Sequence, residues 1–151
     1  MTIVPTVDAR WAGLAAERLK VEDPEFRAVL YEAGLRPADV DDPGARIPFH
    51  KHAALLEVAA KRLDDPLFGL RLGARVHPKR AGLLGYALLG ASTVEDALLS
   101  LERYWRVIGE GVKLDVEIKR KHTILTVTID DHRVAARRQA VEFGVILLVS
   151  L

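Results

Sequence analysis

The segment that says most about the fold is Gly82-Leu83-Leu84-Gly85-Tyr86-Ala87-Leu88-Leu89-Gly90-Ala91-Ser92-Thr93-Val94-Glu95-Asp96-Ala97-Leu98. Its first half is apolar and spaced by glycines, which favours a closely packed helix over residues 82–89. In its second half Ser92 precedes Glu95 by three residues, the pattern of a capping box at a helix start. An apolar stripe then predicts that this helix continues to about Ile108; its members are Val94, Leu98, Leu101, Trp105 and Ile108.

Upstream of this segment, apolar residues again recur at helical spacing. We expect one helix from Asp8 to Val21, a second from Pro24 to Ala33, and a third from Pro48 to Leu63. A short helical segment is predicted over residues 67–72. The stretch between Arg36 and Ile47 contains several proline, aspartate and glycine residues, which predict a loop with a short turn.

Downstream, the hydrophobic period changes from helical to alternating. Apolar and polar residues alternate from Val112 to Ile118 and again from Leu125 to Ile129, which predicts a β-hairpin with one dry face. Asp130 or Asp131 is expected to cap a last helix that runs to the end of the chain. The sequence therefore predicts a single α+β domain over residues 1–151, mostly helical, with a small antiparallel hairpin packed on helices.

The predicted hairpin leaves two open strand edges, and the last helix ends on an apolar residue without a cap. Open edges invite pairing with another chain. We therefore expect either that the chain is a fragment of a longer polypeptide or that it forms a homodimer through the hairpin or the last helix.

Composition limits the function. The 151 residues include 22 basic and 21 acidic side chains, a net charge of +1, whereas a DNA-binding domain usually has a clear basic excess. The chain contains no cysteine, so disulfides and thiolate chemistry are excluded. Met1 to Pro5 lacks the pattern of a signal peptide, and the longest apolar run, Val145 to Val149, is too short to span a bilayer. We expect a cytoplasmic protein without a membrane partner.

No residue pattern indicates catalysis, a metal or a cofactor. His50 and His52 are two residues apart near a helix start, a spacing that separates their side chains, so solvated surface histidines are favoured over a metal site. Paired aspartates such as Asp64-Asp65 lie at helix borders, where capping explains them. The segment from Ala54 to Leu63 is similar to the first helix of a helix-turn-helix, but the next segment is too short and apolar for base recognition. An ordinary core helix is therefore favoured.

Three aromatic residues are candidates for binding a small molecule. Tyr86, Tyr104 and Trp105 lie on segments that are expected to pack together, and their apolar rings carry polar tips that can orient a ligand. The alternative is that all three are core residues whose tips reach solvent or backbone.

Several short motifs in a fixed order resemble the N-terminal, arabinose-binding-type domain of AraC/XylS transcriptional regulators. They are Arg46-Ile47-Pro48, Asp65-Pro66-x-Phe68-Gly69-Leu70-Arg71-x-Gly73, Gly82-x-x-Gly85-Tyr86, and Ser92-Thr93-x-Glu95-x-Ala97-Leu98 followed by Arg103-Tyr104. The resemblance implies a domain that senses an unidentified effector or supports dimerisation. It also implies that promoter DNA is bound only through a separate C-terminal domain, which is absent from this chain.

Two functional hypotheses from different classes follow. The first is the ligand-sensing and oligomerising domain of an AraC-type regulator, in which a ligand binds between helices and sheet. The second is a non-catalytic protein-interaction or structural domain without a small-molecule ligand. An enzyme ranks third, since the sequence contains no acid–base pair or activated nucleophile.

Overall fold

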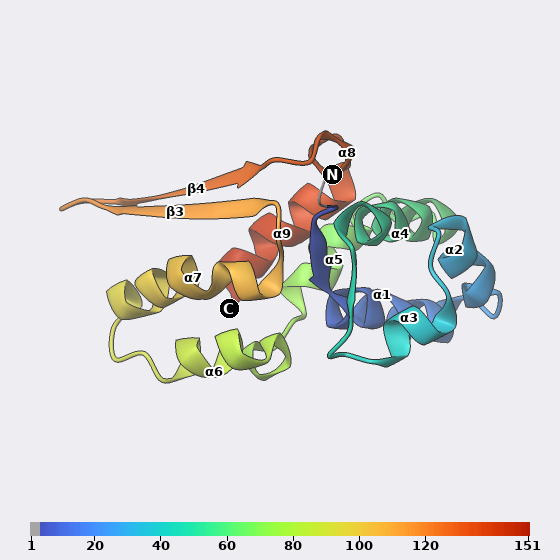
Figure 1. The fold of residues 1–151 in the computed structure, drawn as a ribbon, viewed down its shortest axis with the longest axis horizontal. Coiled ribbons are helices and arrows are strands. Elements are labelled where there is room, and N and C mark those ends of the chain that lie inside the picture. Colours follow the sequence, from blue (N-terminus) through green and yellow to red (C-terminus); the bar gives the residue numbers. More distant parts are fainter. Residues whose placement is uncertain (1–3) are drawn as a thin grey trace.

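Helices dominate the computed structural model, which describes residues 4–151, and two small antiparallel sheets pack against them (Figure 1). This arrangement confirms the predicted α+β class. The expectation about a signal peptide concerns Met1 to Pro5 and falls mostly outside the described residues. In the described part of the chain, no helix combines the length and the hydropathy that crossing a bilayer requires.

The elements follow one another along the chain with short connections. In order they are β1 (Thr6–Asp8), α1 (Ala9–Glu22), α2 (Phe26–Glu32), α3 (Pro37–Asp41), β2 (Arg46–Pro48), α4 (Phe49–Arg62), α5 (Phe68–Ala74), the 3-10 helix η1 (Pro78–Ala81), α6 (Leu83–Leu89), α7 (Val94–Ile108), β3 (Val112–Ile118), β4 (Thr123–Ile129), α8 (His132–Ala135) and α9 (Arg138–Ser150).

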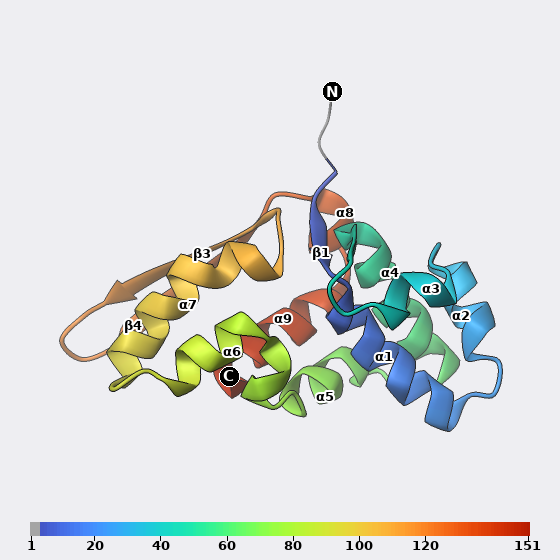
Figure 2. The same cartoon turned by 60° about the horizontal axis from the view of Figure 1, so that its bottom comes forward.

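The molecule is elongated, with different elements at its two ends. Helices α1 to α4 form one end, while α6, α7 and the β3–β4 hairpin form the other (Figures 1 and 2). Helices α5 and α9 lie between them and pack closely against each other. Helix α9 also contacts α4.

The contact between α5 and α9 depends on two glycines. A Cβ atom on Gly69 would collide with the backbone carbonyl of Gln139, and one on Gly73 would lie 2.8 Å from the carbonyl oxygen of Phe143. Glycines four residues apart share one helix face, so this face of α5 meets the backbone of α9 directly. The segment after Ala54–Leu63 is therefore a short helix that packs its glycine face on α9 and leaves Leu70 and Arg71 exposed.

The predicted hairpin forms, and its second strand begins two residues earlier than expected, at Thr123. Three apolar pairs face each other across it: Val112 with Ile129, Leu114 with Val127, and Val116 with Leu125. β3 packs on α7, and the Glu102 carboxylate of α7 accepts a 2.8 Å hydrogen bond from the Val116 backbone N–H. The apolar face of the hairpin is only partly buried: Val112 and Leu114 are buried, whereas Ile118 and Val127 remain exposed.

Two parts of the predicted loop from Arg36 to Ile47 are ordered elements. Pro37 begins α3, and Asp39 accepts a 2.7 Å hydrogen bond from the Arg36 backbone N–H at the start of that helix. Residues 46–48 form β2, which pairs with β1 in a sheet that the sequence did not predict; Val7 opposite Ile47 is its central pair. Strands of three residues are too short to show an alternating pattern.

Two predicted helix ends are also corrected. The N-cap of α7 is Thr93, not Ser92, because the Thr93 hydroxyl is the group that accepts the 3.0 Å hydrogen bond from the Asp96 N–H. The last helix is two helices, α8 and α9, which are separated at Ala136 and Arg137. Asp131 caps α8 as expected, accepting from the Arg133 N–H at 2.9 Å.

Hydrogen bonds that anchor Gln139 explain why a new helix, α9, begins after α8. Its backbone N–H donates to the Glu57 carboxylate, and its side chain accepts from the Gly69 N–H and donates to the Pro66 carbonyl, all at 2.8–2.9 Å. These bonds join the first turn of α9 to both α4 and α5.

Candidate functional site

A cavity of about 180 Å³ lies where several elements meet. Its walls come from β1, α1, α4, α7, β3, β4 and α9, and include Val7, Trp11, His52, Trp105, Val112, Ile129 and Phe143. The cavity is partly open to solvent, and exposed Val127 and Val145 mark its rim on β4 and α9. It therefore lies between the hairpin and helices α1, α4, α7 and α9.

Aromatic rings in mutual contact form one side of the cavity. The ring of Phe143 lies edge-on to Trp11 at a centroid distance of 6.0 Å and edge-on to His52 at 5.6 Å. His52 is in turn stacked on Phe49 at 6.4 Å. These separations are typical of favourable aromatic pairs. The rings fix one another's positions and leave a rigid, preformed surface for a ligand.

His52 is neutral in this setting. The side chain is only 2% exposed, and this burial lowers its pKa from 6.5 to about 4. A neutral imidazole carries one N–H donor and one acceptor nitrogen. Within the described residues, the Nδ1 atom of His52 has no hydrogen-bond partner.

Both tryptophans at the cavity likewise have a ring nitrogen without a hydrogen-bond partner in the described part of the chain. Trp11 and Trp105 are 1% and 6% exposed, and the indole Nε1 of each is buried without a partner among residues 4–151. Native proteins leave few buried polar atoms unpaired. These three nitrogen atoms are themselves fully buried, so they lie in the packed wall behind the cavity surface.

Of the three residues predicted to bind a ligand, Trp105 is the one that lines this cavity. Tyr104 is half-buried and packs against the core, outside the set of lining residues. Tyr86 is 62% exposed on α6 and is also outside that set. The structure therefore does not bring the three together, and their role in ligand binding remains a prediction.

Sequence reasoning missed His52, Trp11 and Phe143. Trp11 and Phe143 occur in apolar patterns of helices, where a core position explains them equally well. His52 was interpreted as a solvated surface histidine, and this is wrong, since it is only 2% exposed and packs between Phe49 and Phe143. The three residues come from positions far apart in the chain. Nothing in the one-dimensional pattern indicates that they share a cavity.

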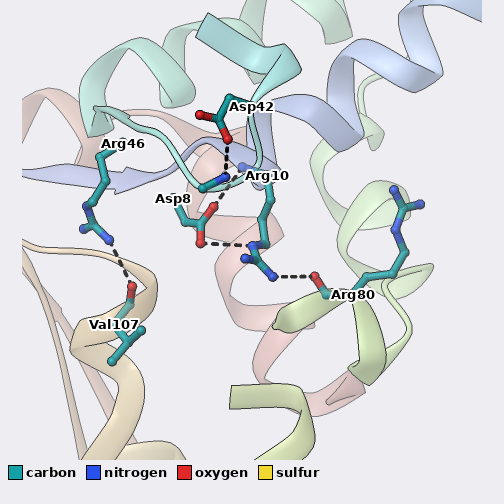
Figure 3. A network of polar contacts seen from close by, with 7 residues as sticks. Asp8, Arg10, Asp42, Arg46, Arg80 and Val107 are labelled. Atoms are coloured by element: carbon teal, nitrogen blue, oxygen red, sulfur yellow. Dashed lines mark hydrogen bonds and ion pairs between the residues drawn. The ribbon is translucent and has the colours of Figure 1, made fainter. Parts of the chain in front are cut away.

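Polar contacts hold the neighbouring backbone in place (Figure 3). The Arg46 guanidinium donates to the Thr6 hydroxyl and carbonyl, each at 2.9 Å, and to the Val107 carbonyl at 3.0 Å. Asp8 caps α1 and accepts from the Arg10 side chain at 3.0 Å. Arg10 continues to the Arg80 carbonyl at 3.4 Å. These contacts tie β1 and β2 to the end of α7, beside the cavity wall.

The described cavity walls suit binding rather than reaction. Among the lining residues in the described part of the chain there is no carboxylate, hydroxyl, ammonium or guanidinium group. Over the same residues, no cluster of three or more histidine and acidic side chains is arranged to hold a metal ion. The arrangement can enclose an apolar molecule.

Comparison with known families identifies the class. The profile of the family described as the arabinose-binding domain of AraC transcription regulators, N-terminal, matches residues 25–151. The chain therefore belongs to this family, which confirms the resemblance inferred from its motifs.

Individual relatives agree with this class. The ornithine utilization regulator of Pseudomonas aeruginosa is 32% identical over 91 residues, which cover 60% of this chain and 27% of that protein. Two uncharacterized HTH-type transcriptional regulators, from Mycobacterium bovis and Mycobacterium tuberculosis, are each 31% identical over 78 residues, covering 51% of this chain and 23% of theirs. The chain thus matches only about a quarter of the length of these regulators.

Proposed function

We propose that this chain is the effector-sensing and dimerising part of an AraC-type transcription regulator of the cytoplasm, with the cavity as its effector site. The observation that carries this proposal is a partly open cavity lined by apolar and aromatic side chains, in a family of regulatory domains. Promoter DNA would be bound by a separate C-terminal domain, because this chain has a net charge of only +1.

The position of the cavity suggests how a ligand acts. Its rim contains Val127 of β4 and Val145 of α9, two elements with exposed surface that another chain or domain can contact. A ligand that binds better to one arrangement of hairpin and α9 shifts the population toward that arrangement, by no more than its difference in affinity. The regulatory signal would pass through these two elements.

The effector itself is not encoded by a motif. The family description mentions arabinose and the name of one relative mentions ornithine. These names make L-arabinose and L-ornithine the first two compounds to test.

Filling the cavity tests the proposal. A Cβ atom on Gly144, which lines the cavity on α9, would meet no atom within 4 Å. Gly144→Leu is therefore expected to occupy the cavity while the fold is kept. A fragment library screened by saturation-transfer NMR should give compounds that bind the unmodified chain and not this variant.

The matched control is Gly90→Leu, at the exposed end of α6 and outside the cavity. It should bind the same fragments as the unmodified chain. If no fragment is lost in Gly144→Leu, the cavity is not an effector site, and an interaction domain without a small ligand becomes the better interpretation.

Dimerisation is the second part of the proposal. Apolar side chains remain exposed on α9, among them Val145 and Val149, and β4 has an unpaired edge. Light scattering across a concentration series should show a homodimer that Val149→Lys weakens. The control Val21→Lys, on α1 at the other end of the molecule, should leave it intact. A monomer at every concentration would contradict the dimer.

A further inference from the structure

We infer that two copies of this chain pair through the open edge of β4, in an antiparallel register centred on Thr126, so that their hairpins form one continuous sheet. The inference rests on the proposed homodimer and goes further by naming the strand, its direction and its register. It also brings a residue of the second copy, Leu125, to the rim of the cavity beside Val127.

The edge of β4 that faces away from β3 is uncovered. Figure 1 shows β3 between β4 and α7, and it is β3 that packs on this helix. Among the described residues β3 is the sole strand that pairs with β4. Apart from its bonds to β3, no residue of β4 makes a backbone hydrogen bond within residues 4–151. A row of backbone donors and acceptors is therefore available on this edge.

The hydrogen-bond pattern of the hairpin shows which residues own these groups. Val116 of β3 donates its N–H to the Glu102 carboxylate and not to β4. Hydrogen-bonded and non-bonded pairs alternate along an antiparallel ladder, so Val116 and its partner Leu125 form a non-bonded pair. By the same alternation, the N–H and C=O groups that point to the open edge belong to Thr123, Leu125, Val127 and Ile129.

The strand lacks the features that protect edge strands in monomers. The seven residues of β4 include no charged side chain, proline or glycine. Monomeric proteins usually place such residues on an edge, or keep the edge strand short, because an open edge pairs readily with another chain. Ile124 and Val127 are also 38% and 36% exposed. This edge therefore suits pairing with a further strand.

One antiparallel register uses all the free backbone groups of two copies. It places Thr126 opposite Thr126 of the second copy, Leu125 opposite Val127, and Thr123 opposite Ile129. Residues with free backbone groups then face one another, and each residue meets one from the same side of the sheet. Leu125 of the second copy lies beside Val127, which lines the cavity. The pairing thereby links the cavity rim to the dimer.

Charge favours a second copy as the partner and antiparallel as the direction. Arg120 and Lys121 precede β4, whereas Asp130 follows it with a side chain that is 50% exposed. Lys113 of the same copy contacts that carboxylate at 3.3 Å and leaves the rest of it to solvent. Antiparallel pairing brings the basic end of each strand to the acidic end of the other, while parallel pairing would bring like charges together.

A single cysteine tests the register, because the chain contains none of its own. The central Thr126 pair is non-bonded between the two copies, so its Cα atoms would be about 4.5 Å apart, within the range of a disulfide. Thr126→Cys should therefore give a disulfide-linked dimer under mild oxidation in non-reducing electrophoresis. The matched control is Thr128→Cys, whose two copies would lie about 13 Å apart along the strands and should stay unlinked.

A charge at the same position tests the pairing without a covalent bond. Thr126→Lys puts like charges opposite each other across the two copies, and should raise the dimer dissociation constant in sedimentation equilibrium about tenfold or more. Within each hairpin the new amino group faces Asp115, which favours the fold. Thr126→Val, which is uncharged and suited to a strand, should dimerise like the unmodified chain.

The outcomes separate this inference from the proposed homodimer. A dimer that Thr126→Lys leaves intact and that Thr126→Cys does not cross-link forms through another surface, such as α9; the inference is then wrong and the homodimer stands. Cross-linking of Thr128→Cys to the same extent as Thr126→Cys would overturn the register. If the unmodified chain is a monomer at every concentration and Thr126→Cys stays unlinked, the strand pairing and the homodimer both fall.

Discussion

At the scale of single residues, Gly69 of α5, which packs against α9, and Gly144, within α9, differ in the space around them. Gly69 touches the backbone of Gln139, whereas Gly144 faces open space. Gly69→Ala is expected to lower the free energy of unfolding by about 1–3 kcal/mol or more, because a backbone atom cannot move aside as a flexible side chain can. Gly144→Ala should raise it by about 0.5–1 kcal/mol, since alanine is the better helix former. Urea titrations of both variants measure the difference, and equal effects would contradict this packing.

His52 makes stability depend on pH. Burial holds its pKa at about 4 in the folded protein, against an ordinary value of 6.5, so the unfolded chain binds more protons between these two values. The free energy of unfolding should therefore fall as the pH falls from about 6.5 to 4, by at most about 3 kcal/mol. Burial also lowers the pKa of His50, which adds to the same slope.

Denaturant titrations at several pH values measure this slope. His52→Phe is expected to flatten it and leave the smaller part that His50 contributes. A slope unchanged in His52→Phe would mean that other groups account for the loss of stability in acid.

At the scale of elements, α7 offers a matched pair of leucines. Leu101 is 4% exposed and Leu99 is 42% exposed on the same helix. Leu101→Ala should lower the free energy of unfolding by about 2–5 kcal/mol, and Leu99→Ala by less than about 0.5 kcal/mol. Thermal and urea unfolding of the two variants check this. Similar losses would show that the helix presents a different face to the core.

Long elements with a clear period could be predicted from the sequence. The α7 stripe and the alternation in the hairpin each extend over several repeats, and both elements formed nearly as expected. The predicted burial of the α7 stripe was less accurate at the N-terminal end of the helix, because Leu98 is only half-buried and Val94 is exposed. The short β1–β2 sheet and the break at Arg137 depend on distant partners, such as the Glu57 carboxylate that anchors the start of α9. No local pattern contains that information.

The candidate site was less predictable than the fold. Trp105 was predicted because it lies on a segment that was expected to pack against its neighbour. The cavity is also lined by Trp11 from α1 and Phe143 from α9. These positions are brought together by the contact of α9 with α4 and α5, which a single sequence does not reveal. Tertiary packing therefore determined the site, whereas periodicity determined the elements.

At the scale of the whole molecule, charge predicts how the chain behaves toward DNA. With 22 basic and 21 acidic residues, it lacks the basic excess that phosphate contacts require. Helix α5, the position of a recognition helix in the alternative interpretation, is packed against α9. We expect no sequence-dependent binding of duplex DNA in fluorescence anisotropy at physiological salt. Specific binding below micromolar concentration would refute this and restore the helix-turn-helix hypothesis for residues 54–72.

The β1 strand and α1 also bear on where this domain begins. The family match starts at residue 25, yet Val7 and Trp11 precede it and form part of the cavity wall. Val7 also bridges to Gly109 at the end of α7, so the first strand touches both ends of the molecule. The unit that folds is therefore longer than the segment by which the family is recognised. A protein trimmed at residue 25 would lose the indole against which Phe143 packs, and would leave the cavity without one of its walls.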